Sequence, residues 1–73
     1  MGYHVVLVRR YHRGLLLELI NKLRIRIISM QRVDCINGIC YELLIFTDKR
    51  TLDKLRRKCI DRSIAMSVDE LGL

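Results

Sequence analysis

Residues 25–47 read IRIISMQRVDCINGICYELLIFT, and this stretch decides the fold. Apolar and β-branched residues, which favour strands, fill both sides of Asn37-Gly38. An Asn-Gly pair between two such runs is the strongest short-range hairpin signal, because a type I′ turn needs positive φ at both central residues. The sequence therefore predicts two antiparallel strands over residues 25–36 and 39–47, joined at Asn37-Gly38.

A two-residue turn at this place also predicts the register of the hairpin, in which Cys35 faces Cys40. Side chains alternate between the two faces of a strand, so each face can be assigned. One face carries Met30, Ile36, Ile39, Tyr41, Leu43 and Ile45. The other face carries Ile27, Val33, Cys35, Cys40, Leu44 and Phe46. The alternation changes phase at Ile27-Ile28, which indicates either cover on both faces or a β-bulge.

The segments outside the hairpin supply two further strands and two helices. Residues 3–9 (YHVVLVR) are β-branched and too few for a stable helix, so they predict a buried strand. Residues 15–23 and 51–61 carry apolar side chains at helical spacing, on a broad stripe in the first and a thinner one in the second. Residues 63–68 alternate as a short last strand, and residues 69–73 are predicted to be a frayed tail.

The predicted order of elements is the βαββαβ arrangement of ferredoxin-like domains. Right-handed crossovers put both helices on one face of a four-stranded antiparallel sheet. The fold class is therefore α+β, with a single domain over residues 1–73. Apolar residues make up 51% of the chain, which excludes a disordered protein.

Two helices can cover only one face of this sheet. The face with Val33, Leu44 and Phe46 is then left toward solvent, and an exposed apolar patch of that kind usually marks an interface. A chain of 73 residues also has a marginal core, which pairing with a second subunit would supplement. We predict a dimer interface at Val33, Leu44, Phe46 and Ile27, with an identical or related chain as partner.

Nearly the whole chain resembles an ACT domain, beginning with the stretch VVLVRRYHRGLLLELINKLRIRIISMQRV. In that family a strand runs into a short loop ending in Gly, and a Leu-rich helix and a strand reading roughly G-I-N-I-x-S follow. The corresponding pieces are Arg13-Gly14-Leu15-Leu16 and residues 24–29, RIRIIS. The strand YELLIFTD is similar to the third strand of regulatory ACT domains. The chain most resembles the ACT-like domain that serves dimerisation in some plant basic helix-loop-helix transcription factors, which implies a non-catalytic dimerisation or regulatory module.

The loop before the first helix departs from the ACT pattern. ACT domains that bind ligands often carry an acid and a Pro beside the loop Gly, as in D-x-P-G. Here the loop reads Tyr11-His12-Arg13-Gly14, so an amino-acid effector would lack the carboxylate that usually helps hold its ammonium group. Only Gly14 matches the family motif. The resemblance implies that a small-molecule effector would contact this loop, and metabolite sensing is one alternative to pairing.

A basic second helix supports another alternative, a nucleic-acid partner. The net charge is +6, and basic side chains gather at Lys54, Arg56, Arg57 and Lys58. An RNA-recognition sheet stacks bases on aromatic residues of its two central strands, whereas Tyr41 and Phe46 lie on opposite predicted faces. A solvated helix face is therefore favoured over nucleic-acid contact.

Residues that carry chemistry are few. The sequence offers no nucleophile paired with a base, no paired carboxylates and no phosphate-binding glycine loop, so we predict no enzyme activity. Two His and three Cys without C-x-x-C spacing predict neither a metal site nor a cofactor. No apolar run approaches the roughly 20 residues of a membrane span, and the expectation is an intracellular protein of the cytoplasm or nucleus, without a membrane partner. Cys35 and Cys40 oppose each other in the predicted hairpin, so a cross-strand disulfide is geometrically possible, but reduced packing is favoured in an intracellular setting. Cys59 is expected to pack as a small hydrophobe.

Overall fold

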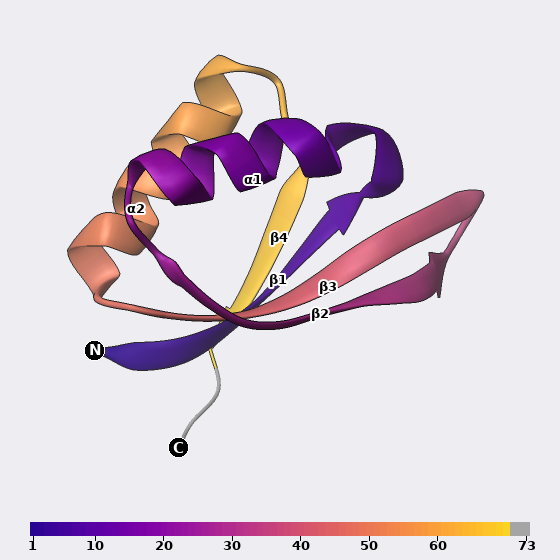
Figure 1. The fold of residues 1–73 in the computed structure, drawn as a ribbon. Coiled ribbons are helices and arrows are strands. Elements are labelled where there is room, and N and C mark those ends of the chain that lie inside the picture. Colours follow the sequence, from indigo (N-terminus) through magenta and orange to yellow (C-terminus); the bar gives the residue numbers. More distant parts are fainter. Residues whose placement is uncertain (71–73) are drawn as a thin grey trace.

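The fold is a four-stranded antiparallel sheet with two helices on one side (Figure 1). The computed structural model describes residues 1–70, with side chains to residue 68. The elements in chain order are β1 (Gly2–Arg9), the 3-10 turn η1 (Arg10–His12), α1 (Arg13–Lys22), β2 (Arg26–Cys35), β3 (Gly38–Thr47), α2 (Lys49–Asp61) and β4 (Met66–Glu70). The strand order is β2-β3-β1-β4, and every neighbouring pair is antiparallel. The predicted α+β, ferredoxin-like fold is confirmed.

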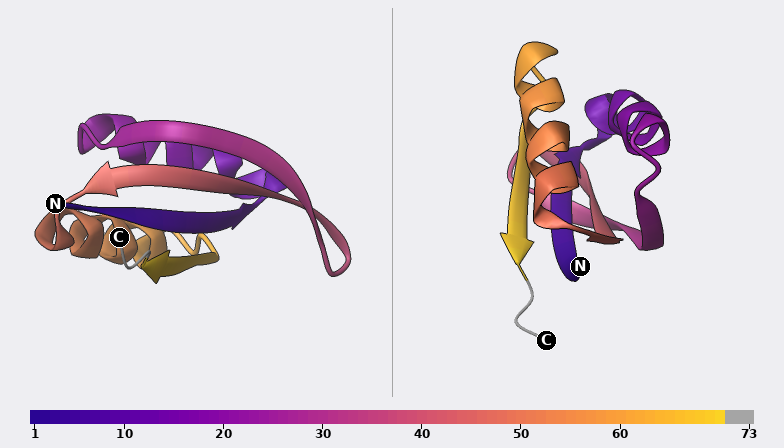
Figure 2. Two further views of the ribbon diagram at one scale, coloured as in Figure 1. Left: turned by 90° about the horizontal axis from the view of Figure 1, so that it is seen from below. Right: turned by 90° about the vertical axis from the view of Figure 1, so that its left-hand side faces the viewer.

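The core lies between the sheet and the two helices, whose arrangement Figure 2 shows from two further sides. Val6 and Val8 of β1 and Leu43 and Ile45 of β3 are at most 1% exposed, because these central strands lie beneath the helices. The helices bury the side chains that recur at helical spacing, namely Leu16, Leu19, Ile20, Leu52, Leu55 and Cys59. The apolar stripes of the sequence therefore face the sheet.

The hairpin turn lies one residue earlier than the sequence predicts. Ile36 and Asn37 form the turn, and β3 begins at Gly38. Asn37 has φ 65°, which Asn tolerates, and Gly38 has φ 155°, which suits a residue without Cβ. Cys35 consequently pairs with Gly38, so the predicted pairing of Cys35 with Cys40 is wrong. The register shift equals two residues, which leaves the alternation of faces unchanged.

A β-bulge in β2 lies between Ile27 and Ser29, where the phase of the alternation changes in the sequence. Ile27 pairs with Ile45, whose side chain is in the core beneath the helices. The prediction that Ile27 shares a face with Val33 is therefore wrong. The extra residue at the bulge inverts the alternation, so the side chains on either side of Ile28 follow different phases.

The bounds of several elements differ slightly from the predicted ones: β2 is one residue shorter at each end, and β4 begins at Met66, three residues after the predicted start of the last strand. α1 begins at Arg13, before the predicted start at residue 15, and α2 begins at Lys49, directly after its N-cap Asp48. The Asp48 side chain accepts a hydrogen bond of 3.3 Å from the backbone N–H of Thr51. β4 continues to Glu70, and the rest of the predicted tail over 69–73 lies outside the described residues.

Candidate functional site

The face of the sheet that is turned away from the helices, the open face, carries a strip of apolar side chains. The register brings onto it Tyr3, Val5, Leu7, Ser29, Gln31, Val33, Glu42, Leu44 and Phe46. The view from below in Figure 2 looks onto this face, with the strands in front of both described helices. Val33, Leu44 and Phe46 are half-buried by their neighbours within the sheet. Three of the four predicted interface residues thus lie together on one surface.

Tyr3 and Phe46 form an aromatic pair at one end of the open face. They are register partners on β1 and β3, with ring centroids 4.9 Å apart and ring planes tilted by 56°. Arg26 of β2 pairs with Phe46 from the other side, so the three residues make one row across the sheet. Tyr3 is not among the residues predicted from the sequence, because its place depends on pairing between strands that are far apart in the chain.

A polar pair divides the open face. The side-chain amide of Gln31 donates a hydrogen bond of 2.8 Å to the Glu42 carboxylate, across β2 and β3. Leu44 and Phe46 lie on one side of this pair along β3, and Val33 lies on the other side along β2. A partner on the open face would therefore meet apolar surface on both sides of a polar centre.

The edge strand β2 is exposed along most of its length. It lies at the end of the sheet, with β3 as its one neighbour. Ile27, Ile28 and Met30 are 38%, 43% and 43% exposed. Ile27 therefore lies at the uncovered margin on the helix side, and any contact that it makes with a partner would involve the edge of the sheet.

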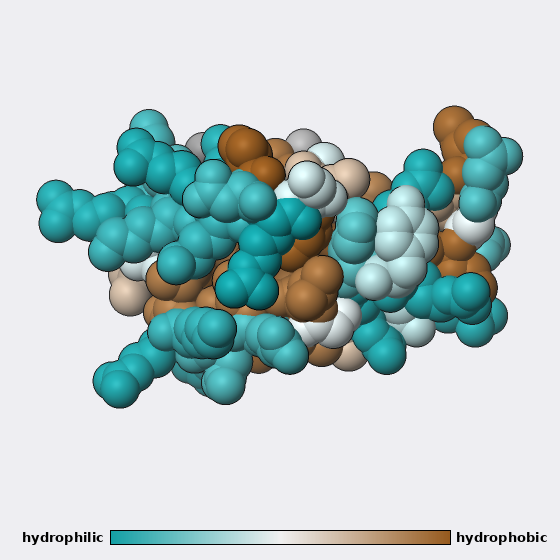
Figure 3. Space-filling model, turned by 90° about the horizontal axis from the view of Figure 1, so that it is seen from above, coloured by the Kyte–Doolittle hydropathy of each residue, from teal (hydrophilic) through white to brown (hydrophobic). Residues whose placement is uncertain are grey.

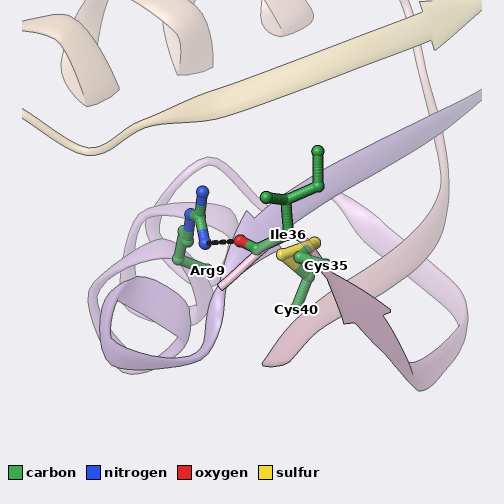
Figure 4. Close-up of a disulfide and its surroundings, with 4 residues drawn as sticks. All are labelled: Arg9, Cys35, Ile36 and Cys40. Atoms are coloured by element: carbon green, nitrogen blue, oxygen red, sulfur yellow. Dashed lines mark hydrogen bonds between the residues drawn. A yellow bond between two sulfur atoms is a disulfide. The ribbon is translucent and has the colours of Figure 1, made fainter. Parts of the chain in front are cut away.

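A disulfide joins Cys35 and Cys40 at the end of the hairpin (Figure 4). Their Cα atoms are 5.7 Å apart, within the range that a disulfide spans. The expectation that both residues are reduced is wrong for this structure, because the register places them diagonally on one face and within bonding reach. Cys59, by contrast, is free and buried as predicted, and burial raises the pKa of its thiol.

The predicted ligand loop is occupied largely by contacts among its own side chains. Tyr11 is 73% exposed and packs edge-on against His12, with ring centroids 4.5 Å apart. The Arg13 guanidinium lies 4.3 Å from the ring centroid of Tyr41, a cation–π contact. Gly14 is in the first turn of α1, and a Cβ there would meet nothing within 4 Å. The packing of the loop therefore does not require a glycine at this position.

Three of the four basic residues predicted on α2 line concave sites, and they do not share one site. Lys54 and Arg57 line a shallow groove along the helix, whereas Arg56 lines a cavity that His4 of β1 also lines. Lys58 is exposed, as are the other three. Figure 3 looks onto the helix-covered side, where hydrophilic side chains cover much of the surface. The surface of α2 is therefore charged, but its basic side chains do not gather around one binding site.

Among residues 1–68, whose side chains the structure describes, no group of three or more His, Cys, Asp or Glu is placed to hold a metal ion. Within that same part of the chain, no helix has the length and apolar character needed to cross a bilayer.

Several solved structures share this fold, although no protein-family description and no curated protein matches the chain. The C-terminal domain of the MgtC protein from Mycobacterium tuberculosis is similar with a TM-score of 0.64 and 14% identity, over 96% of this chain and 86% of that one. Formyltetrahydrofolate deformylase from Burkholderia mallei is similar with a TM-score of 0.62 and 14% identity, over 96% of this chain and 27% of the deformylase. The deformylase from Pseudomonas putida gives a TM-score of 0.62 and 8% identity, over 100% of this chain and 29% of that one. This chain therefore spans less than a third of either deformylase. At such identities the likeness shows the fold alone, which is ferredoxin-like and consistent with the ACT-like form.

Proposed function

We propose that this chain is a non-catalytic pairing module, which joins an identical or related chain through the open face of its sheet. The observation that carries the proposal is the apolar strip of Val33, Leu44 and Phe46, with Tyr3 packed beside Phe46. Removing apolar surface from water contributes about 25 cal/mol for each Å². A second copy on this strip would shield it and add to the small core of the domain.

We also propose that the module is part of a larger regulatory protein of the cytoplasm or nucleus, such as a transcription factor. The deformylases support a setting of this kind, because the part of each that matches this chain is 27% or 29% of its length. When two such modules pair, the other domains of the two chains are held close together, and their effective concentration relative to each other rises.

The mass of the protein in solution, measured by light scattering over a wide concentration range, tests the proposal. We expect a dimer whose dissociation follows mass action on dilution. The variant Leu44→Lys should weaken association about tenfold or more, because the interface would enclose an unpaired charge.

A matched control is Ile60→Lys, which makes the same chemical change at a side chain of α2 that is 74% exposed. Association should be unchanged in this control. A Leu44→Lys variant that is folded and pairs as well as the unmodified chain would contradict the open face as the interface.

Single-stranded nucleic acid is a second candidate partner of the open face, and the Tyr3–Phe46 pair favours it. Although Tyr41 and Phe46 are on opposite faces, Tyr3 and Phe46 lie together on the two central strands, with Arg26 in the same row. Bases stack on exposed rings of this kind, and Arg side chains contact phosphates. Binding of a labelled oligonucleotide should then weaken with salt and with Tyr3→Ala. No binding at low salt would remove this candidate.

A small-molecule effector at the loop before α1 is a third candidate, supported by His12. Its Nδ1 is buried and has no hydrogen-bond partner among the described residues. A panel of amino acids should then shift the amide resonances of Tyr11, His12 and Gly14. An unchanged spectrum across the panel would count against metabolite sensing.

A further inference from the structure

The Cys35–Cys40 disulfide lies on the open face, at the end of the hairpin (Figure 4). Cys40 pairs with Val33 across the ladder, so the bond adjoins a residue of the proposed interface. The ladder between β2 and β3 continues to Cys35, the last residue of β2. Arg9 holds the turn separately, through a hydrogen bond to the backbone carbonyl of Ile36. The end of the hairpin therefore has two sets of contacts that do not depend on sulfur.

The disulfide can be reached from solvent. Both cysteines line a concave site of about 290 Å³, where β1 ends and β4 begins, and the lining also includes Leu7, Arg9 and Ser67. The register places these three side chains on the open face, which the two helices leave uncovered. Cys35 is half-buried, whereas Cys40 is 3% exposed. An attacking thiolate therefore reaches the sulfur of Cys35, and Cys40 becomes the leaving group.

The two cysteines stay close together when the bond is broken. They are five positions apart in the chain, and the ladder keeps their strands paired. Closing so short a loop costs little entropy, so the same two thiols are placed to form the bond again. This arrangement suits a bond that opens and closes while the domain stays folded.

We propose that Cys35 and Cys40 form a reversible redox switch that controls pairing through the open face, an inference that rests on the pairing function proposed above. A thiolate of a dithiol attacks Sγ of Cys35, the S–S bond breaks, and Cys40 leaves as a thiolate. The second thiol of the dithiol then attacks the mixed disulfide and releases Cys35. The dithiol loses two electrons and becomes a disulfide, and its two protons end on the two cysteines. A disulfide oxidant drives the same steps in reverse.

Reduction should alter the open face beside Val33. Two sulfur atoms that are no longer bonded must move apart, because non-bonded atoms repel each other at bonding distance. The side chain of Cys40 is enclosed by its neighbours, so the displacement falls on Cys35 at the end of the edge strand. The end of the hairpin then has more freedom, which a partner must remove on binding. The oxidised form should therefore pair more tightly than the reduced form.

Thiol trapping with iodoacetamide, read by mass spectrometry, follows the bond in buffers of reduced and oxidised dithiothreitol. We expect thiols to appear together at Cys35 and Cys40 under reducing buffers and to disappear when the oxidised reagent is restored. Amide NMR of the full ¹⁵N-labelled chain should show a folded protein in both states, with shifts that extend to Leu7, Val33 and Ser67. A bond that does not form again, a reduced protein that unfolds, or shifts confined to the cysteines and the turn would overturn the switch.

Light scattering of the oxidised and reduced proteins connects the bond to pairing. Reduction should weaken association about fivefold or more, and reoxidation should restore it. The double variant Cys35→Ala, Cys40→Ala should pair like the reduced protein and should not respond to dithiothreitol. Cys59→Ala removes the third cysteine of the chain, and in its folded form this control should keep the response.

The same measurement separates failure of the switch from failure of the pairing function. Equal association of the oxidised and reduced dimers would overturn the switch and leave pairing intact. An oxidised protein that is a monomer at every concentration would overturn the pairing function, and the switch with it.

Discussion

Arg9, the last residue of β1, donates a hydrogen bond of 2.9 Å from its guanidinium to the backbone carbonyl of Ile36. The bond ties the end of a central strand to the turn of the β2–β3 hairpin, where Ile36 is 83% exposed (Figure 4). We expect Arg9→Gln to lower the free energy of unfolding by about 1 kcal/mol, because the shorter side chain loses this charged donor. Urea denaturation followed by circular dichroism measures the change.

The neighbouring residue Arg10 provides the control for this prediction. Arg10 is exposed in η1, and Arg10→Gln removes the same charge. The control should shift the free energy of unfolding by less than about 0.5 kcal/mol. Equal losses in the two variants would attribute the effect to net charge and contradict a role for the hydrogen bond.

The disulfide should stabilise the domain measurably. Reducing Cys35–Cys40 is expected to lower the free energy of unfolding by about 2 kcal/mol, because a short closed loop limits the conformations of the unfolded chain. Denaturation with and without a dithiol reductant measures the difference. The double variant Cys35→Ser, Cys40→Ser should match the reduced protein and be insensitive to the reductant. A reductant effect of the same size in the double variant would assign the loss to another cause.

Gly14 is a position where a substitution is expected to stabilise the domain. A Cβ at this position of α1 would meet no atom within 4 Å, and Gly is a poor helix residue because of the freedom it has when unfolded. Gly14→Ala should therefore raise the free energy of unfolding by about 0.5 kcal/mol. Thermal unfolding of the two proteins gives the comparison. A clear destabilisation would mean that the loop and the helix start need the glycine after all.

The N-cap of α2 predicts a pH dependence. Hydrogen bonds from Thr51 to the Asp48 carboxylate hold the pKa of this carboxyl below its ordinary value. A pKa that is lower in the folded state means that the contribution is present above the unfolded pKa of about 3.9 and is lost as pH falls through the folded value. Asp48→Ala should therefore unfold more easily than the unmodified protein at pH 7, and the difference should shrink as pH falls below about 4. A difference that is constant with pH would exclude the carboxylate as its origin.

Local patterns in the sequence predict the elements well and the pairing between them less well. The Asn37-Gly38 pair identifies the hairpin, because few other sequences accept positive φ at adjacent residues. It does not determine which residue of the pair ends the turn, and Gly38 proves to be the first residue of β3. The phase change at Ile27-Ile28 indicates a bulge, but the face of Ile27 depends on where the extra residue lies.

The residues of the candidate site also differ in whether a local pattern predicts them or whether they depend on pairing between distant segments. Leu44, Phe46 and Val33 could be grouped from one hairpin, since alternation within two adjacent strands is enough to align them. Tyr3 contacts Phe46, and His4 lines a cavity together with Arg56 of α2, only through the pairing of β1 with β3 and the position of α2 over the sheet. Contacts of that range carry no signal in a single sequence.

The bulge in β2 has a consequence for solubility. An edge strand of ten residues with exposed backbone is a template on which further strands can add, and repeated addition is how cross-β fibrils grow. The extra residue at Ile28 interrupts the regular ladder of that edge, and the charges of Arg26 and Arg32 lie along the same strand. The domain can therefore leave one face of its sheet uncovered while its edge resists polymerisation.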